Sequence, residues 1–262
     1  MLNLVRPIPP IHYPDSDGQP MADNTLQFRW IVTLVGGLQR LFADDPLVFV
    51  AGDLLWYPIE GDNKTRIAPD ALVAFGRPKG ERGSYRQWEE GGIAPQVAFE
   101  VLSPGNTAAE MKGKLAFYER HGVEEYYLYD PDRGRLQGWR RQLGTLRAIP
   151  EMRGWTSPRL GVSFDLDGVD LCLSGPDGRR FEGYVEVALR ADAAERRADD
   201  AEQRAETEAQ ARLAAERRTE YEAQARQNAV QRVEAEVQAR LALEAELARL
   251  RGLLSQAPRP EA

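Results

Sequence analysis

Apolar positions in the first 185 residues follow the spacing of helices in some segments and of short strands in others. Between residues 24 and 43 they recur every three or four residues, which predicts an amphipathic helix capped by Asp23 or Asn24. The predicted core-facing stripe of this helix consists of Phe28, Ile31, Val32, Val35, Leu38 and Phe42.

Three short apolar runs bounded by turn residues follow this helix and predict strands. The strands are expected at 47–57, 69–75 and 96–102, a second helix at 107–121, and a fourth strand at 125–129. Glycine-punctuated segments beyond them predict short antiparallel strands. A helix, three strands, a helix and a strand in this order predict an α/β or α+β domain built on a mixed sheet.

The composition changes near residue 186, beyond which the chain consists mostly of Ala, Glu, Arg, Gln and Leu. This composition predicts one long helix of roughly 65 residues and roughly 100 Å. Alanines within 191–205 and leucines within 243–254 follow the three-four spacing of a coiled coil, but the pattern between them keeps no single register. Two interpretations stay open: a weak coiled coil that joins copies of the chain or binds a partner, and a solvated single helix rich in i,i+4 charge pairs.

Four segments are therefore expected along the chain. They are an N-terminal arm at 1–22, a mixed α/β domain at 23–185, a coiled-coil helix at 186–254 and a disordered tail at 255–262. We expect the protein to be a homo-oligomer through the coiled coil. From residue 186 onward the chain carries 13 Arg and 16 Asp or Glu, a net charge of −3, so it is not a basic arm for DNA.

Composition narrows the possible chemistry. The 262 residues carry a formal net charge of −7, so there is no overall basic signature for nucleic acid. One cysteine excludes an internal disulfide or thiolate cluster, and two histidines leave little room for a histidine zinc site. No apolar run approaches the roughly 20 residues that cross a bilayer, and the Pro-rich start does not resemble a signal peptide. We expect a cytoplasmic protein, without a membrane partner, whose chemistry relies on carboxylates, lysine, serine or backbone groups.

A long polar loop at 76–95 is a candidate nucleic-acid contact. Its basic residues are Arg77, Lys79, Arg82 and Arg86, with Tyr85 and Trp88 between them. Loops of this length in compact domains are usually functional or mobile, and basic groups interleaved with aromatic rings suit phosphates and exposed bases. The alternative is an ordinary solvated loop, balanced by its own glutamates.

Two carboxylates are the strongest candidates for a metal site. Asp70 follows Pro69 and opens one apolar strand, whereas Glu100 lies inside the next apolar run. Adjacent strands can hold two carboxylates at one edge of a sheet, which suits Mg²⁺ with several retained waters. The alternatives are a turn or cap role for Asp70 and a structural salt bridge for Glu100, since a buried carboxylate needs a cation or donors.

The helix at 107–121 offers a lysine to these carboxylates. Thr107 and Glu110 form a capping box, which fixes where the helix begins. At about 100° per residue, Lys114 then lies at the edge of the core-facing stripe and Lys112 points to solvent. The chain has 30 arginines but only four lysines, so a lysine here favours a compact charge with a tunable pKa. The alternative is a helix-surface pair of Glu110 with Lys114.

Three motifs, "APDALVAF", "VAFEVLSPGN" and "KGKLAFYERHGVEEYYLYDPD", closely resemble the Uma-two family of the PD-(D/E)xK nuclease superfamily. The resemblance covers about residues 13–182. It implies a restriction-endonuclease-like core, here followed by the long C-terminal helix. It also implies phosphodiester cleavage of nucleic acid, with DNA as the expected substrate and Mg²⁺ or Mn²⁺ as the cofactor.

Carried over to this chain, the resemblance assigns the metal to Asp70, Glu100 and the backbone carbonyl of Val101. Leu102 stands where the superfamily motif has its lysine, and the resemblance implies that Lys114 supplies the amine instead. Tyr118 is expected to orient Lys114 or a water. Asp23 and Asp53 are further acidic groups with an expected structural role. The competing hypothesis is a nuclease-fold module that is weakly active or inactive and acts in binding or assembly through its coiled coil.

Overall fold

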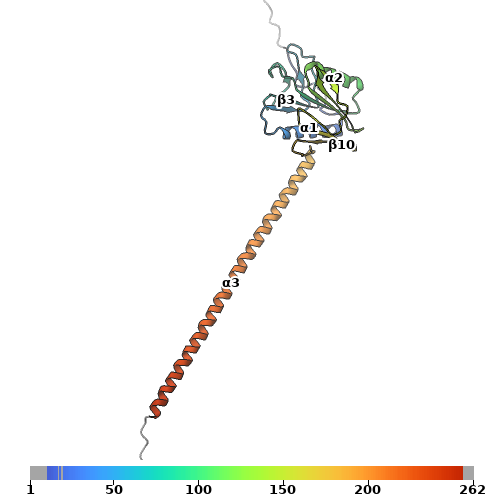
Figure 1. The fold of residues 1–262 in the computed structure, drawn as a ribbon. Helices are drawn as coiled ribbons and strands as arrows, with labels where there is room; N and C mark the ends of the chain where they lie inside the picture. Colours follow the sequence, from blue (N-terminus) through green and yellow to red (C-terminus); the bar gives the residue numbers. More distant parts are fainter. Residues whose placement is uncertain (1–10, 17, 19, 256–262) are drawn as a thin grey trace, which may run out of the picture. The chain divides into compact units, whose positions relative to one another are not determined.

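The computed structural model describes residues 11–16, 18 and 20–255, and in the last helix it describes side chains up to residue 251. The chain divides into two compact units, the first ending at Arg190 and the second beginning at Ala191 (Figure 1). The predicted disordered tail, apart from residue 255, and most of the predicted N-terminal arm lie outside the described residues.

The first unit is a mixed α/β domain, which confirms the predicted fold class. Its helices and strands are α1 (Thr25–Leu41), β1 (Val48–Ala51), β2 (Trp56–Tyr57), β3 (Ala71–Phe75), β4 (Tyr85–Arg86), β5 (Val97–Val101), α2 (Ala108–His121), β6 (Glu125–Asp130), β7 (Arg135–Gln142), β8 (Thr145–Ala148), β9 (Trp155–Thr156), β10 (Ser163–Asp167) and β11 (Asp170–Ser174), and the long helix α3 (Tyr184–Ser255) follows.

A six-stranded sheet in the order β1-β3-β5-β6-β7-β8 forms the centre of this domain. Only β5 and β6 pair in parallel, because α2 carries the chain back between them; the other neighbours are antiparallel. Side chains alternate between the two faces of each strand. On one face Val97, Phe99 and Val101 pack in a core that includes residues of α1 and of the sheet β11-β10-β9. On the other face Ala98 packs with Tyr118 of α2, so Glu100 also projects toward α2.

The single strand expected at 47–57 is wrong, because the chain leaves the sheet after Ala51. Asp53 adopts a left-handed conformation with φ +48°, and its N–H donates to the Pro69 carbonyl at 3.0 Å. At Gly52 an added Cβ would lie 2.7 Å from Cγ2 of Val35, so the chain passes too close to α1 for a larger residue. This bend ends β1 beside the start of β3 and directs the chain into β2, which pairs in parallel with β4.

The predicted apolar stripe of α1 is also partly wrong. The helix buries Trp30 and Leu34 along with Ile31 and Leu38, whereas Phe28 and Val32 are exposed. Because α1 is apolar over a wide arc, its own periodicity admits more than one buried face, and packing on the sheet selects among them. The selected face carries two polar side chains, Gln27 and Thr33, into the interior.

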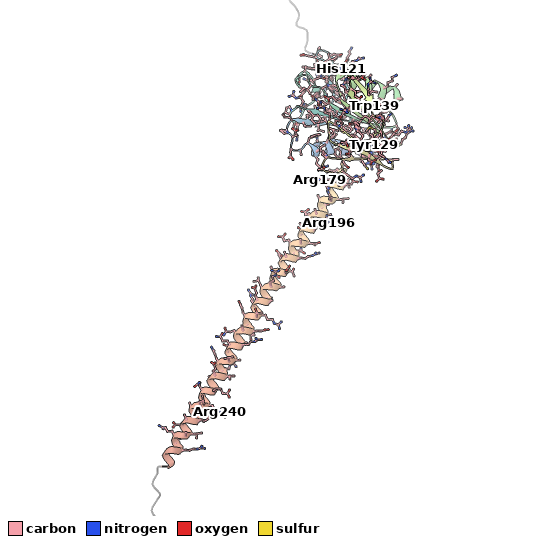
Figure 2. All side chains as sticks on the ribbon, viewed as in Figure 1. His121, Tyr129, Trp139, Arg179, Arg196 and Arg240 are labelled. Atoms are coloured by element: carbon pink, nitrogen blue, oxygen red, sulfur yellow. The ribbon has the colours of Figure 1, made fainter. Side chains whose placement is uncertain are left out.

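The long C-terminal helix predicted from composition is confirmed as α3, 72 residues in length. Its side chains stand out from the helix surface, as Arg196 and Arg240 show in Figure 2. Pairs spaced i,i+4 join Arg212 to Glu208 and Arg240 to Glu244. Its exposed apolar residues include Val230, Val233, Val237, Leu243, Leu247 and Leu250. Both interpretations of this segment, coiled coil and solvated single helix, therefore stay open.

Across residues 11–16, 18 and 20–255, no helix combines the length and the apolar character needed to cross a membrane.

Candidate active site

Asp70 and Glu100 lie side by side at the end of the central sheet. Strands β3 and β5 are antiparallel with Ala71 opposite Phe99, so one further step places Asp70 opposite Glu100. The two residues are 8% and 2% exposed. Asp70 is held there by a hydrogen bond from the Val101 N–H to its Oδ2 at 2.6 Å. The sheet register therefore brings together two carboxylates that are 30 residues apart in the sequence.

Helix α2 brings Lys114 and Tyr118 onto the Glu100 carboxylate. Nζ of Lys114 donates to Oε2 at 2.7 Å, and the Tyr118 hydroxyl donates to Oε1. The two side chains are one helical turn apart, so they reach the same partner from one face of the helix. The capping box of Thr107 and Glu110 is present, and it sets this rotation of the helix.

The choice between the two lysines of α2 agrees with the sequence prediction. Lys112 is exposed, whereas the side chain of Lys114 is only 20% exposed and pairs with Glu100. The alternative, a surface ion pair of Lys114 with Glu110, does not form. The Glu110 carboxylate instead accepts hydrogen bonds from the Asn106 side chain and the Thr107 N–H. The catalytic role of Lys114 stays a prediction.

The cluster holds two buried carboxyl groups and one ammonium. Burial, together with the neighbouring Glu100 charge, raises the pKa of Asp70 well above its usual range. Burial also raises the pKa of Glu100, although the Lys114 ammonium opposes this. Burial alone would lower the pKa of Lys114, but the charge and hydrogen bond of Glu100 outweigh it and raise that pKa. Lys114 is therefore held as an ammonium, and it pairs with Glu100 while Asp70 has no ion pair with it.

The donors present fit a hydrated divalent cation. Asp70, Glu100 and the Val101 carbonyl offer oxygen ligands, and Mg²⁺ typically binds one or two carboxylates while keeping waters. Within the described ranges, no three His, Cys, Asp or Glu side chains converge as a metal cluster, so an all-side-chain cage is not the arrangement here.

An unsatisfied hydroxyl beside the carboxylates supports this fit. Oη of Tyr126 is buried and has no hydrogen-bond partner among the described residues. The Tyr126 ring packs on Tyr118, with ring centroids 4.9 Å apart, and Tyr118 binds Glu100. Burial raises the pKa of Tyr126, and so do the charges of Glu100 and Asp70. Buried polar groups without a protein partner commonly bind an ordered water or ion. The hydration shell of a cation at Asp70 and Glu100 would satisfy this hydroxyl.

Leu102 and Asp23 are not members of the carboxylate cluster. The Leu102 N–H donates to the Tyr129 carbonyl at 2.8 Å, and its side chain packs against the core on the α2 side of the sheet. Asp23 accepts a hydrogen bond from the Ser103 hydroxyl. Leu102 therefore fills with apolar packing the position where the superfamily motif has an amine.

Gln27 of α1 is a member of this region that the sequence did not indicate. Its Nε2 donates to the Val101 carbonyl oxygen at 2.9 Å across 74 residues of sequence, and the side chain is buried. Its Oε1 accepts from the Asp23 N–H at 2.8 Å. No local pattern distinguishes this glutamine from the other polar residues of α1, because its partner lies on a distant strand.

The basic side chains of the loop at 76–95 bind partners within the domain. Arg77 and Arg82 both contact the Glu90 carboxylate, and Arg86 pairs with Glu89. Nζ of Lys79 donates at 2.6 Å to two carbonyls just beyond the C-terminal end of α1. These contacts give the four residues a structural role, and their contact with nucleic acid stays a prediction.

The domain thus combines a mixed sheet with two buried carboxyl groups and a lysine at the ends of two neighbouring strands. The chain belongs to the Uma2 family, since the family model described as "Uma2: Putative restriction endonuclease" matches residues 12–167. This confirms the family resemblance of the sequence motifs.

The domain is also similar to the solved structure of a "putative nuclease belonging to DUF820" from Anabaena variabilis. The two share 18% identity at a TM-score of 0.37, over 50% of this chain and 70% of that one. No curated protein matches the chain.

Proposed function

We propose that this protein is a Mg²⁺- or Mn²⁺-dependent endonuclease that hydrolyses phosphodiester bonds in nucleic acid, with DNA as the first expected substrate. The observation that carries the proposal is the convergence of Asp70, Glu100 and Lys114 at one end of the sheet. Two carboxyl groups beside one ammonium offer oxygen ligands to a divalent cation, and a bound cation would favour their ionised forms despite burial. Family membership as a putative restriction endonuclease supports the same class of reaction.

Each residue would have a distinct task in this proposal. Asp70, Glu100 and the Val101 carbonyl hold the cation, which when bound supplies a water of lowered pKa and stabilises charge on the phosphate. Tyr118 fixes the Glu100 carboxylate through one oxygen and Lys114 binds the other. Because the pKa of Lys114 is raised, the amine stays charged and acts by stabilising negative charge on the attacking water or the phosphate.

The proposal treats the site as a variant of the PD-(D/E)xK arrangement. Asp70 and Glu100 take the two acidic positions, and the amine comes from the helix after the second strand. Nζ of Lys114 reaches Oε2 of Glu100 although Leu102 occupies the motif position. A substitution in the motif is therefore compatible with an intact group of charges.

Cleavage of labelled DNA and RNA by the full chain tests this function. We expect new ends to form with Mg²⁺ or Mn²⁺ and none to form with EDTA, because the site needs a cation to neutralise its carboxylates. Supercoiled, linear and single-stranded substrates separate nicking from other cleavage modes. Absence of cleavage on every substrate with both metals would contradict the proposal and favour a non-catalytic binding module.

That second candidate also has an observation in its favour. Both oxygens of Glu100 already accept hydrogen bonds, from Lys114 and Tyr118, so the cluster is satisfied on the Glu100 side by protein donors alone. A site that serves only to stabilise the fold would have this arrangement as well. The excess carboxylate, Asp70, is what a purely structural pair would lack.

We further propose that α3 joins copies of the chain. Its exposed valines and leucines are unusual on a solvated helix, and association would bury them. Light scattering on the full chain is expected to give a multiple of 29.4 kDa. A chain that ends at Arg190, where the first unit ends, is expected to give the mass of one copy. Equal association states for the two proteins would contradict this role of α3.

A further inference from the structure

We propose that Gln27 is a positioning residue of the metal site, which holds the Val101 carbonyl in the orientation that binds the cation. This inference rests on the proposed function and adds a residue from a different element, α1. Its basis is the hydrogen bond from Nε2 of Gln27 to the Val101 carbonyl oxygen, 2.9 Å long and buried. Gln27 itself is only 6% exposed.

The N–H and the carbonyl of Val101 bind side chains because β3, one of the two strands that pair with β5, ends at this point. Strand β3 begins at Ala71, so no β3 residue is available to pair with Val101. Asp70 accepts the Val101 N–H at 2.6 Å, and Gln27 donates to the Val101 carbonyl. The Val101 N–H is therefore fixed by Asp70, a proposed metal ligand, and the Val101 carbonyl by the neutral side-chain amide of Gln27.

Gln27 is in turn fixed by its own partners. Its side-chain Oε1 accepts the Asp23 N–H at 2.8 Å, and its backbone N–H donates to Oδ1 of the N-cap residue Asn24 at 2.8 Å. The Asp23 carboxylate accepts the Ser103 hydroxyl, which ties the start of α1 to the loop after β5. Both polar ends of the Gln27 side chain are therefore bonded, Oε1 to Asp23 and Nε2 to the Val101 carbonyl.

A carbonyl oxygen has two lone pairs, and Gln27 uses only one of them. The other can bind a cation held by the carboxylates of Asp70 and Glu100. Groups that orient metal ligands without touching the metal typically affect affinity by about 10–100-fold. A neutral amide is suited to this task, because it fixes the ligand without adding a third negative charge to a site that already has excess carboxylate.

The test is the affinity for Mn²⁺, measured by calorimetry on the full chain. Gln27→Met keeps a similar side-chain volume but cannot donate, and we expect it to raise the Kd by about 10–100-fold. Gln39→Met is the matched control: it is the same change at an exposed position of the same helix, and its Kd is expected to equal that of the wild type. Circular dichroism of each variant verifies that the domain is folded at the temperature of the titration.

The possible outcomes separate this inference from the proposed function. Wild-type binding that Glu100→Gln abolishes and Gln27→Met weakens supports both. An unchanged Kd in folded Gln27→Met, with or without a lower melting temperature, overturns the inference alone and leaves Gln27 a structural residue. No Mn²⁺ binding by the wild type overturns both.

A measurement on the wild type avoids dependence on the folding of a variant. In ¹⁵N-labelled protein, Mg²⁺ is expected to shift the side-chain amide resonances of Gln27 and to leave those of Gln39 in place. Resonances of Gln27 that do not move at saturating Mg²⁺ would contradict the inference.

Discussion

Glu100→Gln is expected to reduce metal-dependent cleavage on the order of 10³-fold while the domain stays folded. The substitution removes one of the two charges that attract the cation, and it removes the anionic partner of Lys114. Glutamine has nearly the same shape, and its oxygen still accepts one hydrogen bond from Lys114 or Tyr118. The measurement is the single-turnover rate on the best substrate, with circular dichroism and thermal unfolding as tests of the fold.

Glu125→Gln is the matched control for this substitution. Glu125 is another buried glutamate of the same sheet, 1% exposed, but it binds Ser157 and Tyr127 rather than the site. Its neighbour Tyr127 belongs to the core on the α1 side of the sheet, opposite to Glu100. We expect its folded variant to cleave at the wild-type rate. Equal cleavage by Glu100→Gln and wild type would show that the assignment of the site is wrong.

Lys114→Ala is expected to slow cleavage by on the order of 10²-fold, whereas Lys112→Ala leaves the rate unchanged. Both lysines lie on α2, two residues apart, but only Lys114 contacts Glu100. Removing the ammonium leaves the two buried carboxylates without a fixed protein cation, and it removes stabilisation of negative charge in the transition state. Rates for the two variants with the same substrate and metal provide the comparison.

We expect no fall in the cleavage rate across neutral pH from loss of the Lys114 charge. Because the Glu100 charge raises the pKa of Lys114 despite burial, the ammonium does not titrate in the neutral range. Lys114→Arg should therefore retain more activity than Lys114→Ala, since it keeps the charge with a different shape. Equal loss in Lys112→Ala and Lys114→Ala would contradict the assignment of the amine.

The sequence was most informative where local geometry determines the outcome. Apolar runs located the strands of Asp70 and Glu100, and the capping box at Thr107 fixed the rotation of α2 so that Lys114 faced the sheet. These features depend on periods of two and 3.6 residues that begin at recognisable positions. The family motifs then related the three residues to one another.

Features that depend on distant contacts could not be predicted in the same way. The hydrogen bond of Gln27 to Val101 joins residues 74 positions apart, and no local sequence pattern near residue 27 predicts it. The left-handed bend at Asp53 was hidden inside an apolar run that favoured one continuous strand. The apolar residues of α1 cover a wide arc, so the sequence alone did not identify the buried face. Packing on the sheet buries Trp30 and Leu34 and leaves Phe28 and Val32 exposed.

The most direct test of the central claim, that Asp70 and Glu100 hold a divalent cation beside Lys114, is a Mn²⁺ binding isotherm of the full chain. The account predicts saturable binding by the wild type that is lost in Glu100→Gln and in Asp70→Asn, with both variants folded. Binding by folded Glu100→Gln and Asp70→Asn with the wild-type affinity would contradict it.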